Sequence, residues 1–170
     1  GQNAMLVDSS ALPEQVVKDA ISSAFLSAGQ RCSALRILCV QEEVADRVIK
    51  MLAGAMQELV IGDPCLLTTD IGPVIDHEAL AILQAHQQRM EREAKRIAPA
   101  PMDSALGGHF FAPLAYEIPN LQVLQREVFG PILHVLRYRS RDLDALIDQI
   151  NATGYGLTMG IHSRIDRTQR

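Results

Sequence analysis

The chain has 170 residues, enough for one ordinary domain with a core of its own. With 48% apolar and 21% charged residues, the composition excludes an intrinsically disordered chain. The net charge is −4 and basic residues are interleaved with acidic ones, so we expect no nucleic-acid partner. No apolar run is long enough to span a bilayer, no signal peptide opens the chain, and the three cysteines lack paired spacing. We therefore expect no membrane span, no disulfide framework and a reducing, cytoplasmic setting.

The chain begins with a short apolar run, 4–7, which predicts a buried strand. Apolar residues then recur at helical spacing, which predicts a helix that starts near Pro13 and ends at Gly29. The next strand is predicted over 35–40, with Cys39 packed inside it.

A second helix is predicted over 41–59, with an apolar stripe on one face. A turn follows, and Cys65 is expected in an exposed loop. Asp76 can cap a long polar helix that runs to about Ile97. On that helix His77 and His86 lie nine residues apart, which is not the spacing of a helical metal pair, so we expect both to be solvated.

The second half of the chain repeats the alternation in shorter elements. These are strands over 109–113, 132–136 and 158–162 and a helix over 142–150. Ser140 can cap that helix, and a new helix is expected after Ser163. Alternating strands and helices predict an α/β fold, with a mainly parallel sheet and flanking helices on both faces. No glycine-rich phosphate-binding motif follows a strand, so we expect no nucleotide-binding half in this chain.

Cys32 lies in the turn between the first helix and the second strand, where residues 29–32 read Gly-Gln-Arg-Cys. A turn can fix a thiol in place and leave it accessible, and a nucleophile needs both. The alternative for an arbitrary cysteine is a small, buried apolar side chain.

Residues 29–34 (Gly-Gln-Arg-Cys-Ser-Ala) resemble the Gly-Gln-x-Cys active-site segment of the aldehyde dehydrogenase superfamily. Residues 127–131 (Glu-Val-Phe-Gly-Pro) resemble its Glu-x-Phe-Gly-Pro cofactor segment. Weaker likenesses follow the family's order at 62–64 (Gly-Asp-Pro), 72–75 (Gly-Pro-Val-Ile), 108–113 (Gly-His-Phe-Phe-Ala-Pro) and 151–157 (Asn-Ala-Thr-Gly-Tyr-Gly-Leu). The stretch around 93–108 departs from the family pattern, and we expect a surface connection there.

Within the superfamily, four runs of sequence resemble the Δ1-pyrroline-5-carboxylate dehydrogenase half of the bacterial bifunctional proline utilization enzymes: residues 1–5, 27–36, 69–76 and 149–157. The resemblance implies that residues 1–170 are part of an aldehyde dehydrogenase catalytic domain whose NAD-binding domain and C-terminal part lie outside the chain. It implies NAD-dependent oxidation of L-glutamate γ-semialdehyde to glutamate, in proline catabolism, through a cysteine thioester. FAD would belong only to the proline dehydrogenase half of such a parent. The general base and an oxyanion-hole asparagine would also lie outside the chain, so we expect the chain alone to be inactive.

The same resemblance assigns roles to five residues. Cys32 would be the nucleophile, and Arg31 and Ser33 beside it would bind the carboxylate of the substrate. Glu127 would hold the ribose hydroxyls of NAD, and Phe129 would pack near the nicotinamide. Apart from the resemblance, a solvated turn acid and a core aromatic are the alternatives for these last two. No residue is assigned to a metal.

Two other functions stay open. One is a dehydrogenase for another acidic semialdehyde, of the succinic or succinylglutamate type. The other is a non-catalytic α/β module that serves in assembly or folding. For the enzyme, we expect a small semialdehyde as substrate and a homo-oligomeric parent.

Overall fold

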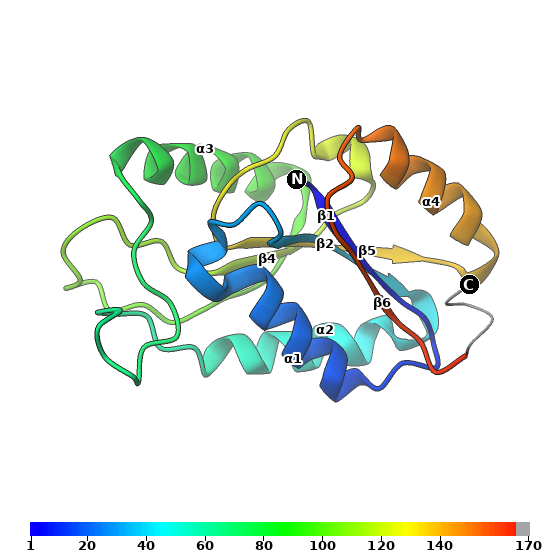
Figure 1. The fold of residues 1–170 in the computed structure, drawn as a ribbon, viewed down its shortest axis with the longest axis horizontal. Coiled ribbons are helices and arrows are strands. Elements are labelled where there is room, and N and C mark those ends of the chain that lie inside the picture. The colour runs from blue at the N-terminus through cyan, green and yellow to red at the C-terminus, as the bar shows by residue number, and fades with distance from the viewer. Residues whose placement is uncertain (166–170) are drawn as a thin grey trace.

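A six-stranded sheet lies at the centre of the computed structural model, which describes residues 1–165 (Figure 1). Its order is β3-β4-β5-β2-β1-β6, and all neighbours are parallel except β3, which is antiparallel to β4 at one edge. The predicted α/β fold with a mainly parallel sheet is confirmed. The strands are β1 Asn3–Val7, β2 Leu35–Gln41, β3 Lys95–Pro99, β4 Leu114–Glu117, β5 Ile132–Tyr138 and β6 Met159–His162.

Helices cover both faces of the sheet, because parallel neighbours must be joined by crossover connections. Helices α1 (Pro13–Phe25) and α2 (Glu42–Gln57) lie on one face, and α3 (His77–Glu93) and α4 (Leu143–Ala152) lie on the other (Figure 1). Short 3₁₀ turns, η1 to η3, occupy Leu26–Gly29, Leu121–Val123 and Ser140–Asp142. Within residues 1–165, no helix is both long and apolar enough to cross a membrane.

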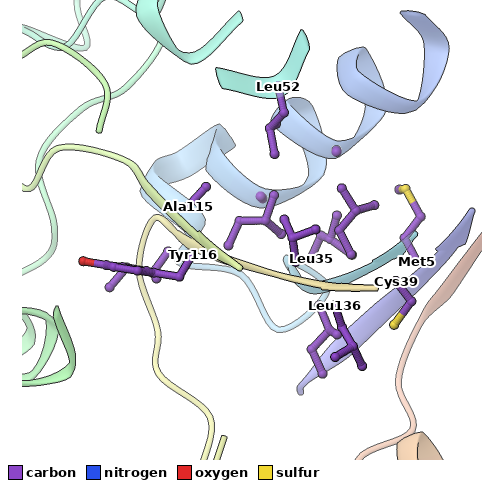
Figure 2. Close-up of a cluster of buried hydrophobic side chains, with 14 of the residues drawn as sticks. Met5, Leu35, Cys39, Leu52, Ala115, Tyr116 and Leu136 are labelled. Carbon is purple, nitrogen blue, oxygen red and sulfur yellow. The ribbon is translucent and has the colours of Figure 1, made fainter. Parts of the chain in front are cut away.

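The core lies between the sheet and these helices. Strands β1 and β2 are buried along their whole length, as expected for central strands covered on both faces. Figure 2 shows Leu52 of α2 pointing toward the strands that carry Leu35, Cys39 and Ala115. Leu52 and Cys39 are fully buried, which confirms the predicted core position of that cysteine. Burying a side chain of the size of Leu52 contributes about 1.5–3 kcal/mol to the free energy of unfolding.

The first helix ends four residues earlier than Gly29, the predicted end. It stops at Phe25, and residues 26–29 form the turn η1. The cause is local, because Ser27 and Ala28 adopt left-handed backbone conformations with φ of 58° and 51°. Non-glycine residues rarely adopt these values, so the apolar periodicity did not reveal the break.

The third helix also ends early, at Glu93 rather than near Ile97. Residue 94 is extended, with φ of −140°, and residues 95–99 form the edge strand β3, paired with β4. This strand falls within the stretch where a surface connection was expected. The predicted start is confirmed, because the Asp76 carboxylate accepts a 2.8 Å hydrogen bond from the Ala79 N–H.

The prediction of a strand over 109–113 is wrong, since the strand β4 begins only after this segment, at Leu114. Pro113 has no N–H to donate, whereas the Leu114 N–H donates to the Pro131 carbonyl at 2.9 Å. Ser140 lies in a 3₁₀ turn and makes no capping hydrogen bond to α4. The helix expected after Ser163 falls mainly on residues 166–170, outside the described residues.

Candidate active site

Cys32 is exposed in the turn between η1 and β2, so the buried alternative for this thiol is wrong. The Asn3 side-chain amide donates to the Cys32 carbonyl at 2.7 Å and to the Ala34 carbonyl at 2.8 Å. Within the turn, the Ala34 N–H donates to the Arg31 carbonyl at 3.1 Å. The backbone that carries the thiol is therefore fixed from β1, while the thiol itself stays accessible.

The backbone N–H of Cys32 is a free donor. No residue among those the structure describes accepts a hydrogen bond from it. A free N–H beside an exposed thiol is the arrangement that can stabilise negative charge on an oxygen bonded to the attacked carbon.

Gln30 ties the Cys32 turn to the segment 72–75, one of the weaker family likenesses. Its side-chain oxygen accepts from the Ile75 N–H at 2.7 Å. Its side-chain nitrogen donates to the Pro73 carbonyl at 3.3 Å and to the Ser27 carbonyl at 3.2 Å. An amide is suited to this position because it both donates and accepts.

Gly29 brings the Cys32 turn into contact with the segment 127–131. Its backbone is left-handed, with φ of 64°, and a Cβ atom added there would lie 2.3 Å from the Gly130 carbonyl oxygen. The same Cβ would lie 2.8 Å from the Ala24 carbonyl oxygen. Only glycine satisfies both the backbone conformation and the close approach. The two strongest family likenesses, about 100 residues apart in sequence, thus meet at a glycine–glycine contact.

Arg36 joins the same two segments from inside the sheet. It is 2% exposed, and its two terminal nitrogens donate to the Gly130 carbonyl at 2.7 Å and to the Gly29 carbonyl at 2.5 Å. Its guanidinium carbon lies 5.3 Å from the centre of the Phe129 ring, within cation–π range. Burial lowers the pKa of Arg36 to about 10, and attraction to Glu127 opposes that shift. Sequence reasoning missed this residue, although a single arginine inside the apolar run 35–40 was a usable signal.

Glu127 and Phe129 lie on the loop that precedes β5. The Glu127 side chain is only 16% exposed, so it is not a freely solvated turn acid. Its backbone N–H donates to the Tyr155 hydroxyl at 3.3 Å, which joins the 151–157 likeness to this loop. Phe129 is 43% exposed, so it is not a core aromatic. A carboxylate that can only accept hydrogen bonds and an open aromatic face are suited to a nucleotide's ribose hydroxyls and its ring.

Arg31 and Ser33 flank Cys32 on the exposed turn. Within residues 1–165, neither side chain has a hydrogen-bond or ion-pair partner. Their cationic and hydroxyl groups are therefore available to an acidic ligand at the thiol.

His86 corrects the expectation that both histidines of the third helix are solvated. His77 is exposed, but His86 is buried, and its Nε2 atom lies 2.9 Å from Nε2 of His134 on β5. The His134 Nδ1 atom lies 2.9 Å from the Arg36 carbonyl oxygen. Burial lowers the pKa of both rings; Arg89 and Arg126 lower the pKa of His86 further, and His86 lowers that of His134 further. The nine-residue spacing of His77 and His86 argued against a metal pair on one helix. It could not reveal that His86 has a partner, His134, on another element.

The aldehyde dehydrogenase family model matches residues 1–170. The chain is 55% identical to the bifunctional protein PutA of Escherichia coli over 174 aligned positions, which cover 99% of this chain and 13% of that protein. It is 32% identical to the 1-pyrroline-5-carboxylate dehydrogenase of Geobacillus kaustophilus, covering 96% of this chain and 32% of that enzyme.

Solved structures agree with these relatives. A crystal structure of a bifunctional proline utilization A protein matches with a TM-score of 0.95 and 54% identity, over 99% of this chain and 17% of that one. A methylmalonate-semialdehyde dehydrogenase from Oceanimonas doudoroffii matches with a TM-score of 0.91 and 25% identity, over 100% of this chain and 36% of that one. The chain thus spans a minor part of each relative's length. The predicted resemblance is confirmed, and the chain belongs to the aldehyde dehydrogenase family.

Proposed function

We propose that residues 1–170 form part of the catalytic domain of an NAD-dependent dehydrogenase that oxidises L-glutamate γ-semialdehyde to glutamate in proline catabolism. The observation that carries the proposal is the contact of the Cys32 turn with the Glu127–Phe129 loop through Gly29 and Gly130. That contact joins the turn that carries an exposed thiol to the loop that carries a carboxylate and an open aromatic ring. The names of the relatives, PutA and 1-pyrroline-5-carboxylate dehydrogenase, supply the substrate.

In the proposed reaction the Cys32 thiolate attacks the aldehyde carbon and forms a carbon–sulfur bond. The free Cys32 N–H donates to the oxygen that becomes negative in this step. Bound NAD supplies the acceptor for the hydride that leaves this carbon. Water then cleaves the resulting Cys32 thioester, which releases glutamate and restores the thiol.

The chain's own groups fit a nicotinamide nucleotide. The Glu127 carboxylate would accept hydrogen bonds from the ribose hydroxyls, and the open face of Phe129 would pack against the nicotinamide. FAD is assigned to no residue of this chain and would serve only a proline dehydrogenase half of the parent.

The unpaired side chains of Arg31 and Ser33 would bind the carboxylate of the semialdehyde. A charge-assisted hydrogen bond to a carboxylate is roughly twice as strong as a neutral one, so this pair favours acidic aldehydes. Changing Ser33 to alanine should therefore raise KM for glutamate semialdehyde and leave kcat nearly unchanged. An unaltered KM would refute the assignment of Ser33.

The test of the function is NADH formation by the full-length parent polypeptide with glutamate semialdehyde. Cys32→Ala should abolish it, and Cys65→Ala, the change of another exposed cysteine, should not. If activity survives Cys32→Ala, Cys32 is not the nucleophile and the proposed mechanism is wrong. Greater activity on succinic or succinylglutamate semialdehyde would favour the other acidic-semialdehyde enzymes.

We expect no turnover by the purified 170-residue chain, since the general base and most of the NAD site are assigned to segments outside it. We also propose that the parent is a cytoplasmic homo-oligomer. A Cys32 thiol no more reactive than that of Cys65 in the parent would instead favour the non-catalytic module.

A further inference from the structure

We propose that Arg36 is a positioning residue that holds the Cys32 turn and the Glu127–Phe129 loop at one fixed separation, and that the buried pair His134–His86 orients it. The inference rests on the proposed function, because the two segments matter together only if the thiol and the nicotinamide must meet.

The geometry of Arg36 is that of a clamp. Its guanidinium donates one hydrogen bond to Gly29, three residues before Cys32, and one to Gly130, directly after Phe129. Because the guanidinium is planar and rigid, two bonds from one fork fix the distance between the two carbonyl oxygens. A lysine, with a single nitrogen, cannot impose that distance.

The burial of Arg36 needs an explanation. Within residues 1–165, no carboxylate lies within ion-pair distance of it, and its Nε atom has no hydrogen-bond partner. A buried cation without an ion pair contributes little to stability compared with an apolar side chain of the same size. Its contacts point to another role, since all three reach loops of the candidate site: two carbonyls and the Phe129 ring.

The histidine pair fixes Arg36 from its backbone side. A carbonyl only accepts, so His134 Nδ1–H donates to the Arg36 carbonyl, and His134 Nε2 must then accept from His86 Nε2–H. Arg89 lies 3.4 Å from the remaining nitrogen, His86 Nδ1, and can donate to it. Burial, which lowers the pKa of both rings, keeps them neutral, so each has a single consistent tautomer.

This cluster is not a ligand pocket. The cavity lined by Arg36, His86, His134 and Glu127 has a volume of only about 10 Å³. That is room for no more than about one water molecule. The two Nε2 atoms are at direct hydrogen-bond distance, which leaves no space for an ion between them.

The test compares Arg36→Met, Arg36→Lys and His134→Phe in the full-length parent, with Arg137→Met as the control. Arg137 lies on the same sheet and binds Glu117 and Asp46, away from the site. Steady-state rates are measured with ordinary semialdehyde and with semialdehyde deuterated at the aldehyde carbon. NAD affinity is measured by calorimetry, and folding by thermal unfolding.

A positioning role predicts that Arg36→Met lowers kcat about 10- to 100-fold, since a misplacement of about 1 Å can cost that much. The deuterium isotope effect should rise, because transfer from a misplaced carbon becomes rate-limiting, and the NAD dissociation constant should rise several-fold. Arg36→Lys should recover part of kcat, His134→Phe should shift all three readouts the same way, and Arg137→Met should shift none.

A purely structural role predicts a different pattern, in which less protein folds but the folded protein keeps the wild-type isotope effect and NAD affinity. That result would overturn the proposal. If Arg36→Met does not fold, Arg36→Lys decides by the same readouts. If the wild-type parent oxidises no semialdehyde, the proposed function is wrong, whatever the Arg36 variants show. The clamp is tested separately, because an unchanged NAD dissociation constant in the Arg36 variants would refute it.

Discussion

Changing Gly29 to alanine tests the contact on which the candidate site depends. The left-handed backbone at this position costs alanine about 1–2 kcal/mol. The added Cβ would lie 2.3 Å from one carbonyl oxygen and 2.8 Å from another, and relieving such overlap costs typically about 1–3 kcal/mol. The free energy of unfolding should therefore fall by about 2–5 kcal/mol, measured by urea unfolding followed by circular dichroism.

Two other glycines separate these contributions. Gly154 has a similar backbone, with φ of 77°, but open space around its Cβ position, so Gly154→Ala should cost only about 1–2 kcal/mol. Gly54 lies in the exposed interior of α2 with nothing within 4 Å, so Gly54→Ala should stabilise by about 0.5–1 kcal/mol. If Gly29→Ala cost no more than Gly154→Ala, the close approach to Gly130 would be wrong.

The remaining predictions concern the groups around this contact. Gln30→Leu removes three hydrogen bonds and should lower the free energy of unfolding, measured by urea unfolding, by about 1–3 kcal/mol. A variant as stable as wild type would contradict the link that Gln30 makes between the Cys32 turn and the segment 72–75. Because His86 and His134 have lowered pKa values when folded, the unfolded chain binds more protons between about pH 6.5 and pH 4. Stability should thus fall as the pH falls through this window, by on the order of 1.4 kcal/mol per pH unit for each ring, and the urea midpoint of a His134→Phe variant should depend less on pH. Burial raises the pKa of Cys39 to about 12, so iodoacetamide at neutral pH should label Cys32 in the native protein and Cys39 only after unfolding. Labelling of Cys39 in the native protein would contradict its buried position in the core.

Local patterns were sufficient for most of the fold. Apolar runs located β1, β2 and β5, because these strands are buried along all or nearly all of their length. Strand β6 was located too, although none of its residues is buried. Pro13 and the Asp76 cap indicated the starts of α1 and α3. It failed where partners distant in sequence decide the conformation. The edge strand β3 was divided between the end of a helix and a surface connection, since only pairing with β4 makes that polar segment extended.

The residues of the candidate site likewise divide into those that local motifs predicted and those that they missed. The turn with Cys32 and the loop with Glu127 and Phe129 were predicted from short motifs, since each motif is contiguous. Arg36 and the buried His86–His134 pair were missed, because their roles depend on contacts between elements that lie 48 to 98 residues apart. No local spacing records such contacts.

The order of the strands has a consequence for biosynthesis. Strand β1 precedes the other five strands in the chain, yet one of its two neighbours in the sheet is β6, about 150 residues later. Until β6 emerges, one edge of β1 has unsatisfied backbone groups, which is the kind of edge that pairs wrongly with other chains. Asn3, which holds the Cys32 turn, also accepts a hydrogen bond from the Thr158 N–H just before β6. The geometry around the thiol is therefore completed only after β6 has been synthesised, and a ribosome-bound chain that ends before β6 would hold a loose Cys32 turn.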